Sequence, residues 1–164
     1  MKMSPKLEKS FNEQITAEIF SAHQYLAMAL YVDADGFRGS CNWLYKQYQE
    51  ELEHANKMIK YLMDRGNKAV VPAIKAPETS YGKLVNVFEE VLKHEQYVTK
   101  KIHELYGIAM EEKDLSAQIF LNWFVSEQDE EEENAGNAVD MLTKAGDNMG
   151  AQMMIDQQLG SRAK

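Results

Sequence analysis

Acidic side chains occur in this chain at positions where a helix would turn its apolar face inward. In four long segments the apolar residues recur at alternating steps of three and four, which is the period of an amphipathic helix. Each of these stripes is interrupted near its middle by polar residues: Glu18, then Glu51 with His54, then Glu95, then Gln128 with Glu131. Glutamate is almost never fully buried unless it is paired, so four helices that agree on such an interruption predict a shared site.

The chemistry expected of this set is metal binding. The four stripes contain no lysine or arginine that could neutralise the carboxylates. Two divalent cations would balance the charges of the four glutamates, and oxygen ligands with one imidazole suit iron or manganese better than copper or a thiolate-bound zinc. Taken alone, Glu18 or Glu95 is better explained by a surface position in a helix whose register is shifted by one residue. The joint pattern favours a two-metal site.

The spacing of these residues is the most specific signal. Glu51 and His54 stand three apart and therefore share one helix face, and Gln128 with Glu131 repeats that pair imperfectly. Glu18 and Glu51 are 33 residues apart (51 − 18 = 33), and so are Glu95 and Gln128 (128 − 95 = 33). We interpret this as two helical hairpins of matched geometry, each presenting a lone glutamate and a pair at the same depth.

The elements that must position these residues follow from the same periodicity. We expect an all-α, single domain over residues 1–164 with long helices at about 5–35, 40–66, 79–111 and 116–146, the second capped by Ser40. A short link at 36–39 makes the first two helices antiparallel. Prolines at 72 and 77 exclude a helix in the next segment, which we expect to be a strand-like crossover along the bundle. A turn near Lys113 joins the last two long helices, and residues 148–159 predict a short fifth helix.

Charge and composition exclude several classes of function. The net charge is −8, from 18 basic and 26 acidic residues, which disfavours nucleic acid as a partner. The stretch MKMSPKLEKSF lacks the apolar core of a secretory signal, and the longest apolar run, 25–32, is too short to span a bilayer. The single cysteine, Cys41, fits a reducing compartment. We therefore expect a cytoplasmic protein that does not associate with membranes.

Four segments resemble the non-haem ferritins of bacteria and archaea, nearly from end to end of the chain: NEQITAEIFSAHQY at 12–25, QEELEH at 49–54, HEQYVTKKIHEL at 94–105 and FLNWFVSEQDEEE at 120–132. The resemblance implies a ferritin-like four-helix bundle with a long crossover between helices 2 and 3. It also implies a di-iron centre, with a first iron site and a second one bridged by Glu51. The implied first-site ligands are Glu18, Glu51 and His54; those of the second are Glu51, Glu95 and Glu131, with Gln128 and Tyr25 close by.

The family also has a third iron site inside the wall of its protein cage, and Glu50, Glu127 and Glu130 fall on its positions. The acidic run from 127 to 133 is explained equally well as a solvated helix face. Bacterioferritins, which resemble this chain at most of the same ligands, bind haem through a methionine where Leu52 stands here, so we expect no haem. The remaining methionines, among them Met58, Met63 and Met110, are expected to fill the core. We expect His23, His94 and His103 at exposed or capping positions, and a secondary metal contact at His94 stays open as an alternative.

The resemblance implies oxidation of ferrous iron with dioxygen or peroxide, and storage of the ferric product in a homo-oligomeric cage of 24 subunits. Two alternatives stay open. One is a di-iron oxidase or peroxidase of the same fold that stores no iron; the rubrerythrin form of it has a cysteine-rich second domain, against which the single cysteine argues. The other is a non-catalytic helical interaction module whose buried polar residues only fix the packing register.

Overall fold

The computed structural model describes residues 2–161 and has five helices in that range. Residue 1 and residues 162–164, the ends of the domain expected over 1–164, lie outside the described residues. The all-α bundle and its short fifth helix are confirmed. The helices are α1 (Pro5–Ala34), α2 (Arg38–Asp64), α3 (Leu84–Glu111), α4 (Leu115–Ala145) and α5 (Met149–Gly160).

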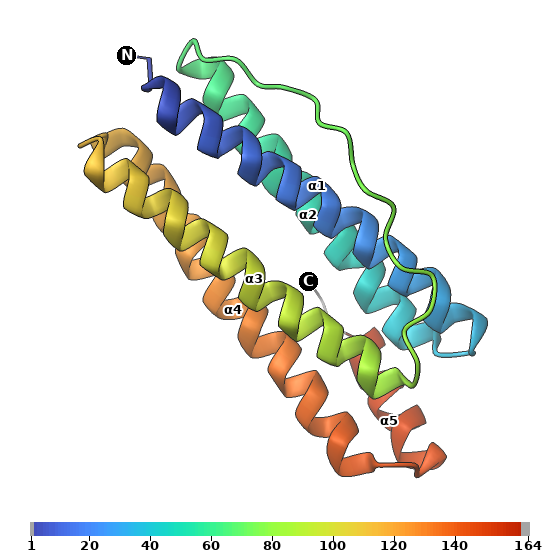
Figure 1. Ribbon diagram of the computed structural model, residues 1–164. Helices are drawn as coiled ribbons and strands as arrows, with labels where there is room; N and C mark the ends of the chain where they lie inside the picture. Colours follow the sequence, from blue (N-terminus) through green and yellow to red (C-terminus); the bar gives the residue numbers. More distant parts are fainter. Residues whose placement is uncertain (1, 162–164) are drawn as a thin grey trace.

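The long helices form two antiparallel hairpins, α1 with α2 and α3 with α4, which pack against each other through α1 and α3 (Figure 1). The crossover between α2 and α3 runs along α1 from one end of the bundle to the other, as Figure 1 shows. The helix α5 packs across the far end, against α2 and α4. Because the crossover returns the chain to that end, α3 runs parallel to α2 and antiparallel to α1, as a ferritin-like connection requires.

Two predicted helix starts were wrong. The helix α2 begins at Arg38 with Phe37 as its N-cap, so Ser40 lies inside the helix rather than capping it. The hydroxyl of Ser40 instead donates to Asp156 of α5, at 2.7 Å. The helix α3 begins at Leu84 rather than near residue 79, because Gly82 adopts a positive φ of 75° that interrupts the helical backbone just before it.

The crossover is extended but forms no strand within the described part of the chain, so the expected strand-like passage is corrected to an irregular one. It is held to α1 by side chains rather than by a backbone ladder. Asn12 donates to the Lys68 carbonyl at 2.9 Å and accepts from the Val70 amide at 2.8 Å. Glu8 accepts from the side-chain amide of Asn67 at 2.6 Å. The two bonds of Asn12 satisfy backbone groups that no neighbouring strand could reach.

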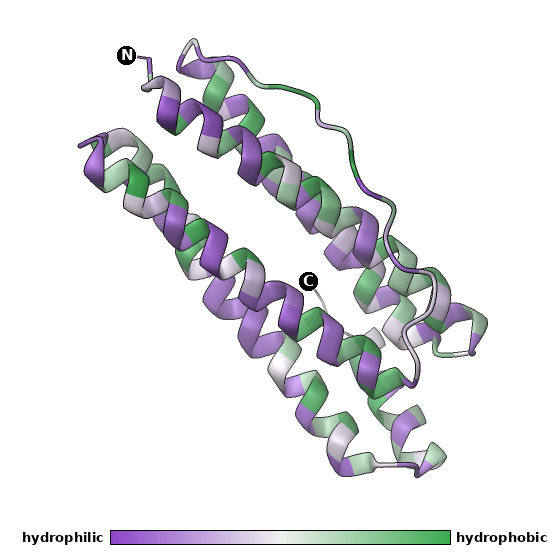
Figure 2. Cartoon of the chain, viewed as in Figure 1, coloured by the Kyte–Doolittle hydropathy of each residue, from purple (hydrophilic) through white to green (hydrophobic). Residues whose placement is uncertain are grey.

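The apolar core forms two clusters, one toward each end of the bundle, with polar residues of all four long helices between them. On α1, for example, Ile15 belongs to one cluster and Tyr25 to the other, and Glu18 lies between. Polar and apolar residues alternate along every long helix in Figure 2, because each helix keeps one face inward. Met58 is buried as expected, whereas Met63 and Met110 are 65% and 58% exposed and do not fill the core.

Candidate metal centre

The polar layer between the two clusters consists of the residues that interrupted the four stripes. All six are buried, with exposed fractions of 0% to 4%: Glu18, Glu51, His54, Glu95, Gln128 and Glu131. The structure therefore places all six inside the bundle, away from solvent. Ionised carboxylates at such depth carry a large desolvation cost, so the layer needs compensating positive charge or protons.

Glu18, Glu51 and His54 form the tightest group. One potential ligand atom from each lies within 4.8 Å of the other two, a spacing that can surround a single cation. The His54 Nδ1 atom is 3.9 Å from Glu18 Oε2 and 3.8 Å from Glu51 Oε1. Both oxygens of Glu51, and Oε2 of Glu18, are buried with no hydrogen-bond partner among the residues described here. Lone pairs in this state are available to a metal ion.

Glu95 and Glu131 are held by neighbouring donors. The Tyr25 hydroxyl donates to Glu95 Oε1, and the Gln128 amide donates to Glu95 Oε2 at 3.1 Å. The Gln47 amide donates to Glu131 Oε2 at 2.7 Å. Every residue in this group is buried, so these bonds form away from bulk water, where they constrain the carboxylates most strongly.

The electrostatics of the layer follow from burial. Loss of hydration raises the pKa of Glu18 and of Glu51 well above the usual glutamate range, and the neighbouring carboxylates raise both further. Burial also raises the pKa of Glu95, to about 7, although the hydrogen bonds from Tyr25 and Gln128 oppose the shift. Burial, with the charge of Glu95, raises the pKa of Tyr25 well above 10, so the phenol stays protonated. Without a cation the layer therefore holds protons near neutral pH.

A pocket of about 440 Å³ opens on the α2–α4 side of this layer, and Glu50, Glu127 and Glu130 all line it. His54 reaches the same pocket, with Nε2 3.9 Å from Glu127 Oε1. Lys57 and Trp123 also line it, with the Lys57 ammonium 3.1 Å above the Trp123 ring centre. The acidic run on α4 is thus divided: Gln128 and Glu131 point into the core, and the residues between and beside them face outward.

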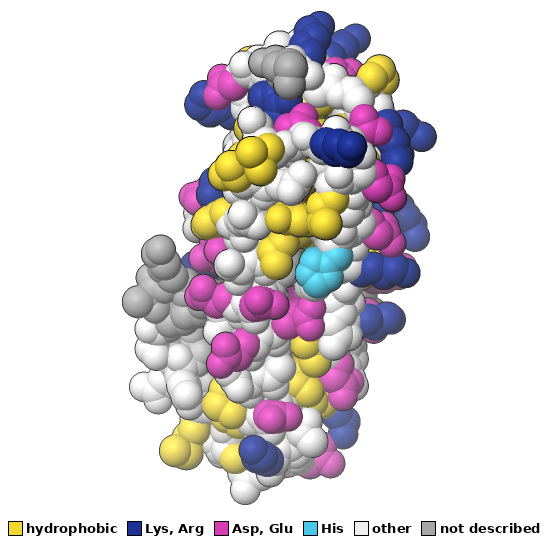
Figure 3. Space-filling model, turned by 90° about the vertical axis from the view of Figure 1, so that its left-hand side faces the viewer, with side chains coloured by type: hydrophobic (Ala, Val, Ile, Leu, Met, Phe, Trp, Pro, Cys, Tyr) yellow, Lys and Arg dark blue, Asp and Glu magenta, His cyan; other side chains and the backbone are white. Residues whose placement is uncertain are grey.

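The charged side chains on the surface are unevenly distributed. On the face in Figure 3, acidic side chains are spread over the middle and lower parts, and basic ones gather at the top and along one edge.

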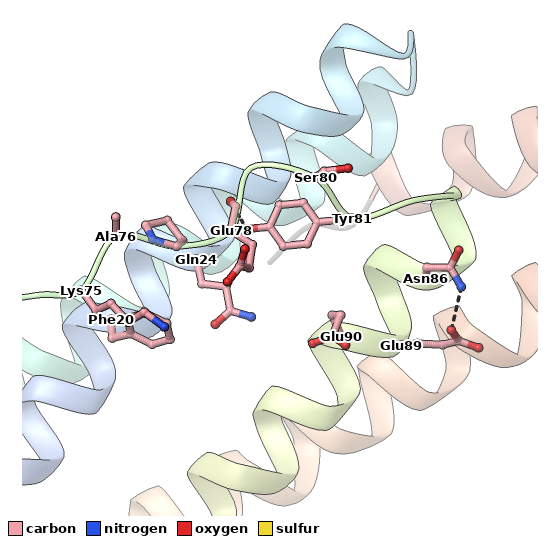
Figure 4. Close-up of a pocket in the computed structure, with 11 residues that line it drawn as sticks. Phe20, Gln24, Lys75, Ala76, Glu78, Ser80, Tyr81, Asn86, Glu89 and Glu90 are labelled. Atoms are coloured by element: carbon pink, nitrogen blue, oxygen red, sulfur yellow. Dashed lines mark hydrogen bonds between the residues drawn. The ribbon is translucent and has the colours of Figure 1, made fainter.

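A second pocket, of about 400 Å³, lies between the crossover, α1 and α3 (Figure 4), and Glu78, Glu89 and Glu90 are among its lining residues. None of the predicted ligands lines that second pocket, so it is separate from the buried layer.

Three residues near the layer were not predicted to have a role there. Gln14 and Gln47 were assigned no function, yet both are buried and donate to carboxylates of the layer. His94 was expected at an exposed or capping position, but it is half-buried and lies 2.6 Å from the Ser21 hydroxyl; burial lowers its pKa to about 4. His23 and His103 are exposed, as expected. A buried glutamine inside an apolar stripe was the signal that could have identified Gln14 and Gln47.

Comparison with known proteins places this arrangement in a family. The ferritin-like domain family, Ferritin, matches residues 8–145, which span all four long helices almost completely. The chain belongs to the ferritin family. The bacterial non-haem ferritin of Bacteroides fragilis is 44% identical over 160 residues, covering 98% of this chain and 99% of that protein. That of Staphylococcus aureus is 36% identical over 160 residues, covering 98% and 96%.

Solved ferritin structures share the whole fold. The open-pore ferritin of the hyperthermophilic archaeon Archaeoglobus fulgidus superposes with a TM-score of 0.97 at 41% identity, covering 99% of each chain. The bundle, the crossover and the short last helix are thus features of this ferritin chain and of its relatives alike. Within residues 2–161, we find no helix that combines the length and the apolar character needed to cross a membrane.

Proposed function

We propose that this ferritin is an iron-storage protein whose buried polar layer oxidises ferrous iron. Ferrous iron is its substrate and cargo. The proposed first-site ligands are Glu18, Glu51 and His54. Glu51 also bridges to a second site with Glu95 and Glu131, and Gln128 and Tyr25 stand beside it.

One observation carries the proposal: the carboxylate of Glu51 and Oε2 of Glu18 are buried without a hydrogen-bond partner, next to an imidazole, in the part of the chain that the structure describes. Unsatisfied buried acceptors are costly, and a folded chain retains them where a ligand completes them. A cation is the ligand that satisfies both their lone pairs and their charge. Carboxylates with one imidazole suit iron.

Two ferrous ions held by one layer can each give one electron to the same oxidant. With dioxygen, two Fe(II) and two protons give two Fe(III) and one hydrogen peroxide; with peroxide as oxidant, two Fe(II) and two protons give two Fe(III) and two waters. The paired transfer avoids release of superoxide. The carboxylates favour the ferric product, while one imidazole, that of His54, and the neutral amide of Gln128 leave the site less negative than an all-carboxylate cage, so that ferric iron can leave.

The pocket on the α2–α4 side is the proposed third iron site, formed by Glu50, Glu127 and Glu130. Its support is that His54 borders both the pocket and the buried layer. Ferric iron leaving the layer would pass through this pocket to the mineral. We further propose that the protein assembles into a homo-oligomeric cage of 24 subunits and is located in the cytoplasm. We propose that it binds no haem, since Leu52 stands where bacterioferritins have their haem methionine.

The test is ferrous oxidation by the full-length protein, followed colorimetrically as Fe(II) disappears in air. Glu51→Ala and His54→Ala are expected to lose most of the activity of the wild type, whereas Glu104→Ala, which removes an exposed carboxylate of α3 outside both the layer and the α2–α4 pocket, is the matched control and should retain it. Unchanged rates in the first two variants would leave only the non-catalytic interaction module.

A second candidate, a di-iron oxidase or peroxidase without storage, shares the same buried layer. Size-exclusion chromatography separates the two, because storage requires a closed shell. A species of about one subunit mass would remove the storage role and retain the oxidase. A large assembly that retains ferric iron after oxidation is the expected result.

A further inference from the structure

We infer that Gln14 and Gln47 are positioning residues, one for each of the two proposed metal sites. Gln14 orients Glu18 in the first site, and Gln47 orients Glu131 in the second. The inference rests on the proposed function, since it concerns the same buried layer. Neither glutamine is a ligand in that proposal. Each acts through the carboxylate that it holds.

Gln14 fixes which oxygen of Glu18 faces the site. The two residues stand four apart on α1, on the same helix face. Gln14 is 1% exposed, and its amide donates to Glu18 Oε1 at 2.8 Å. The other oxygen, Oε2, has no hydrogen-bond partner among the described residues and lies 3.9 Å from His54 Nδ1. The amide therefore holds one oxygen and leaves the other directed at the metal ligands.

Gln47 makes the corresponding contact between helices. It lies on α2, one turn before Glu51, is 0% exposed, and donates to Glu131 Oε2 on α4 at 2.7 Å. The bond ties α2 to α4 at the level of the layer. A shift of α4 relative to α2 would break it, so the position of the Glu131 carboxylate depends on the Gln47 amide.

The chemistry of the amide suits this task better than the alternatives. A lysine at either position would donate equally well, but its positive charge would compete with the cation for the carboxylate. A glutamate would bring a fifth negative charge and no donor when ionised. Glutamine donates an N–H without changing the charge of the layer. Groups that orient metal ligands in this way typically contribute about 10- to 100-fold to metal affinity.

The experiment measures the binding of Zn(II) and Co(II) to the assembled, iron-free protein by calorimetry and by visible absorption of Co(II). The variants are Gln14→Met and Gln47→Met, which keep the length of the side chain and remove the donor. Gln14→Asn and Gln47→Asn are a second pair, which keep an amide but withdraw it from the carboxylate. Gln118→Met is the matched control, because its amide donates to the Ala109 carbonyl, outside the layer. Thermal unfolding and size-exclusion chromatography establish that each variant is folded and assembled.

The assignment of one glutamine to each site is tested in a His54→Ala background, which removes an imidazole ligand of the first site only. In that background Gln47→Met is expected to weaken the remaining cation about tenfold, and Gln14→Met to change it less than about twofold. In the wild-type background each variant should weaken one of the two binding steps assigned to the layer and alter the Co(II) spectrum. A purely structural role would lower stability without this selectivity.

Unchanged affinities in both the Met and the Asn variants would overturn the inference and leave the proposed function intact, because the wild type would still bind two cations in the layer. If substitution of either glutamine weakened both binding steps equally, the assignment of one glutamine to each site would be overturned. A wild type that binds no cation in the layer would overturn the proposed function and this inference together.

Discussion

The Tyr25 hydroxyl donates a hydrogen bond to Oε1 of Glu95, joining α1 to α3 in the middle of the buried layer. Both side chains are at most 2% exposed. The bond stabilises the ionised form of Glu95 and so opposes the rise in pKa that burial causes. The readiness of Glu95 to bind a cation near neutral pH is therefore set by a residue from another helix.

Tyr25→Phe tests this relationship. Without the hydroxyl the pKa of Glu95 should rise further above about 7, so more of the carboxyl is protonated at pH 6 to 7. Ferrous oxidation is expected to fall about tenfold at pH 6.5 and to recover partly at pH 8.5, since each unit of pKa changes the ionised fraction by up to about tenfold. Stopped-flow oxidation at the two pH values is the measurement. Tyr31→Phe, which removes a hydroxyl bonded to the Gly82 carbonyl, is the control. An equal loss at both values would contradict the prediction.

The iron-free protein should lose stability as the pH rises. The folded pKa of Glu95 is raised from 4.5 to about 7, and those of Glu18 and Glu51 are raised in the same direction. A raised pKa means that the folded state binds the proton more tightly, so this contribution is complete below about pH 4.5 and is lost as the pH rises through 7. The Tm of the iron-free protein is expected to fall between pH 5.5 and 8, and Glu95→Gln should reduce the slope. Added Zn(II) should restore the Tm at pH 8, because the cation replaces the protons. A Tm that rises with pH in the metal-free protein would be inconsistent with the buried carboxylates.

Glu51→Gln should separate stability from metal binding. The substitution removes a buried negative charge that the structure leaves without a hydrogen-bond partner, so the Tm of the iron-free protein at pH 8 should rise by a few degrees. Zn(II) affinity should fall by at least about 100-fold, since loss of a shared ligand exceeds the usual effect of an outer partner. Calorimetry and thermal unfolding on the same samples give both numbers. Glu104→Gln, at an exposed position of α3 outside the layer and the α2–α4 pocket, should change neither. A less stable Glu51→Gln protein would argue against an uncompensated charge.

Asp156 should anchor the last helix to the bundle. It accepts from the Gly39 amide at 2.9 Å and from the Ser40 amide at 2.7 Å, so α5 supplies the cap that Phe37 does not give to α2. The approach is so close that a Cβ on Gly39 would lie 1.8 Å from the Asp156 carbonyl oxygen. Asp156→Ala leaves buried donors unpaired and is expected to cost about 1–3 kcal/mol. Limited proteolysis should then cut α5 first, while ferrous oxidation, measured on the same sample, is largely retained. The exposed Asp147→Ala variant should resist proteolysis like the wild type; equal resistance in Asp156→Ala would contradict the anchoring role.

The sequence determined the class of fold and the position of the buried layer. Apolar residues at helical spacing require each of the four helices to bury one face. Glu18 and Glu95 each interrupt such a stripe, and the same separation of 33 residues in both hairpins (51 − 18; 128 − 95) indicates that they lie at the same depth. Helix ends were less well determined. Ser40 satisfied the local rule for an N-cap, yet the tertiary contact with Asp156 engages it inside the helix, because a capping bond can come from a residue distant in sequence.

Only the tertiary structure decided which donors hold which carboxylates. Nothing in the spacing of Gln47 pairs it with Glu131, 84 positions away, because the contact depends on how α2 packs against α4. The same holds for Tyr25 and Glu95, and for the imidazole of His54, which lies between the layer and the α2–α4 pocket. Periodicity reports the face on which a residue lies. The partner that it meets there is set by the packing of two helices, which one-dimensional spacing does not encode.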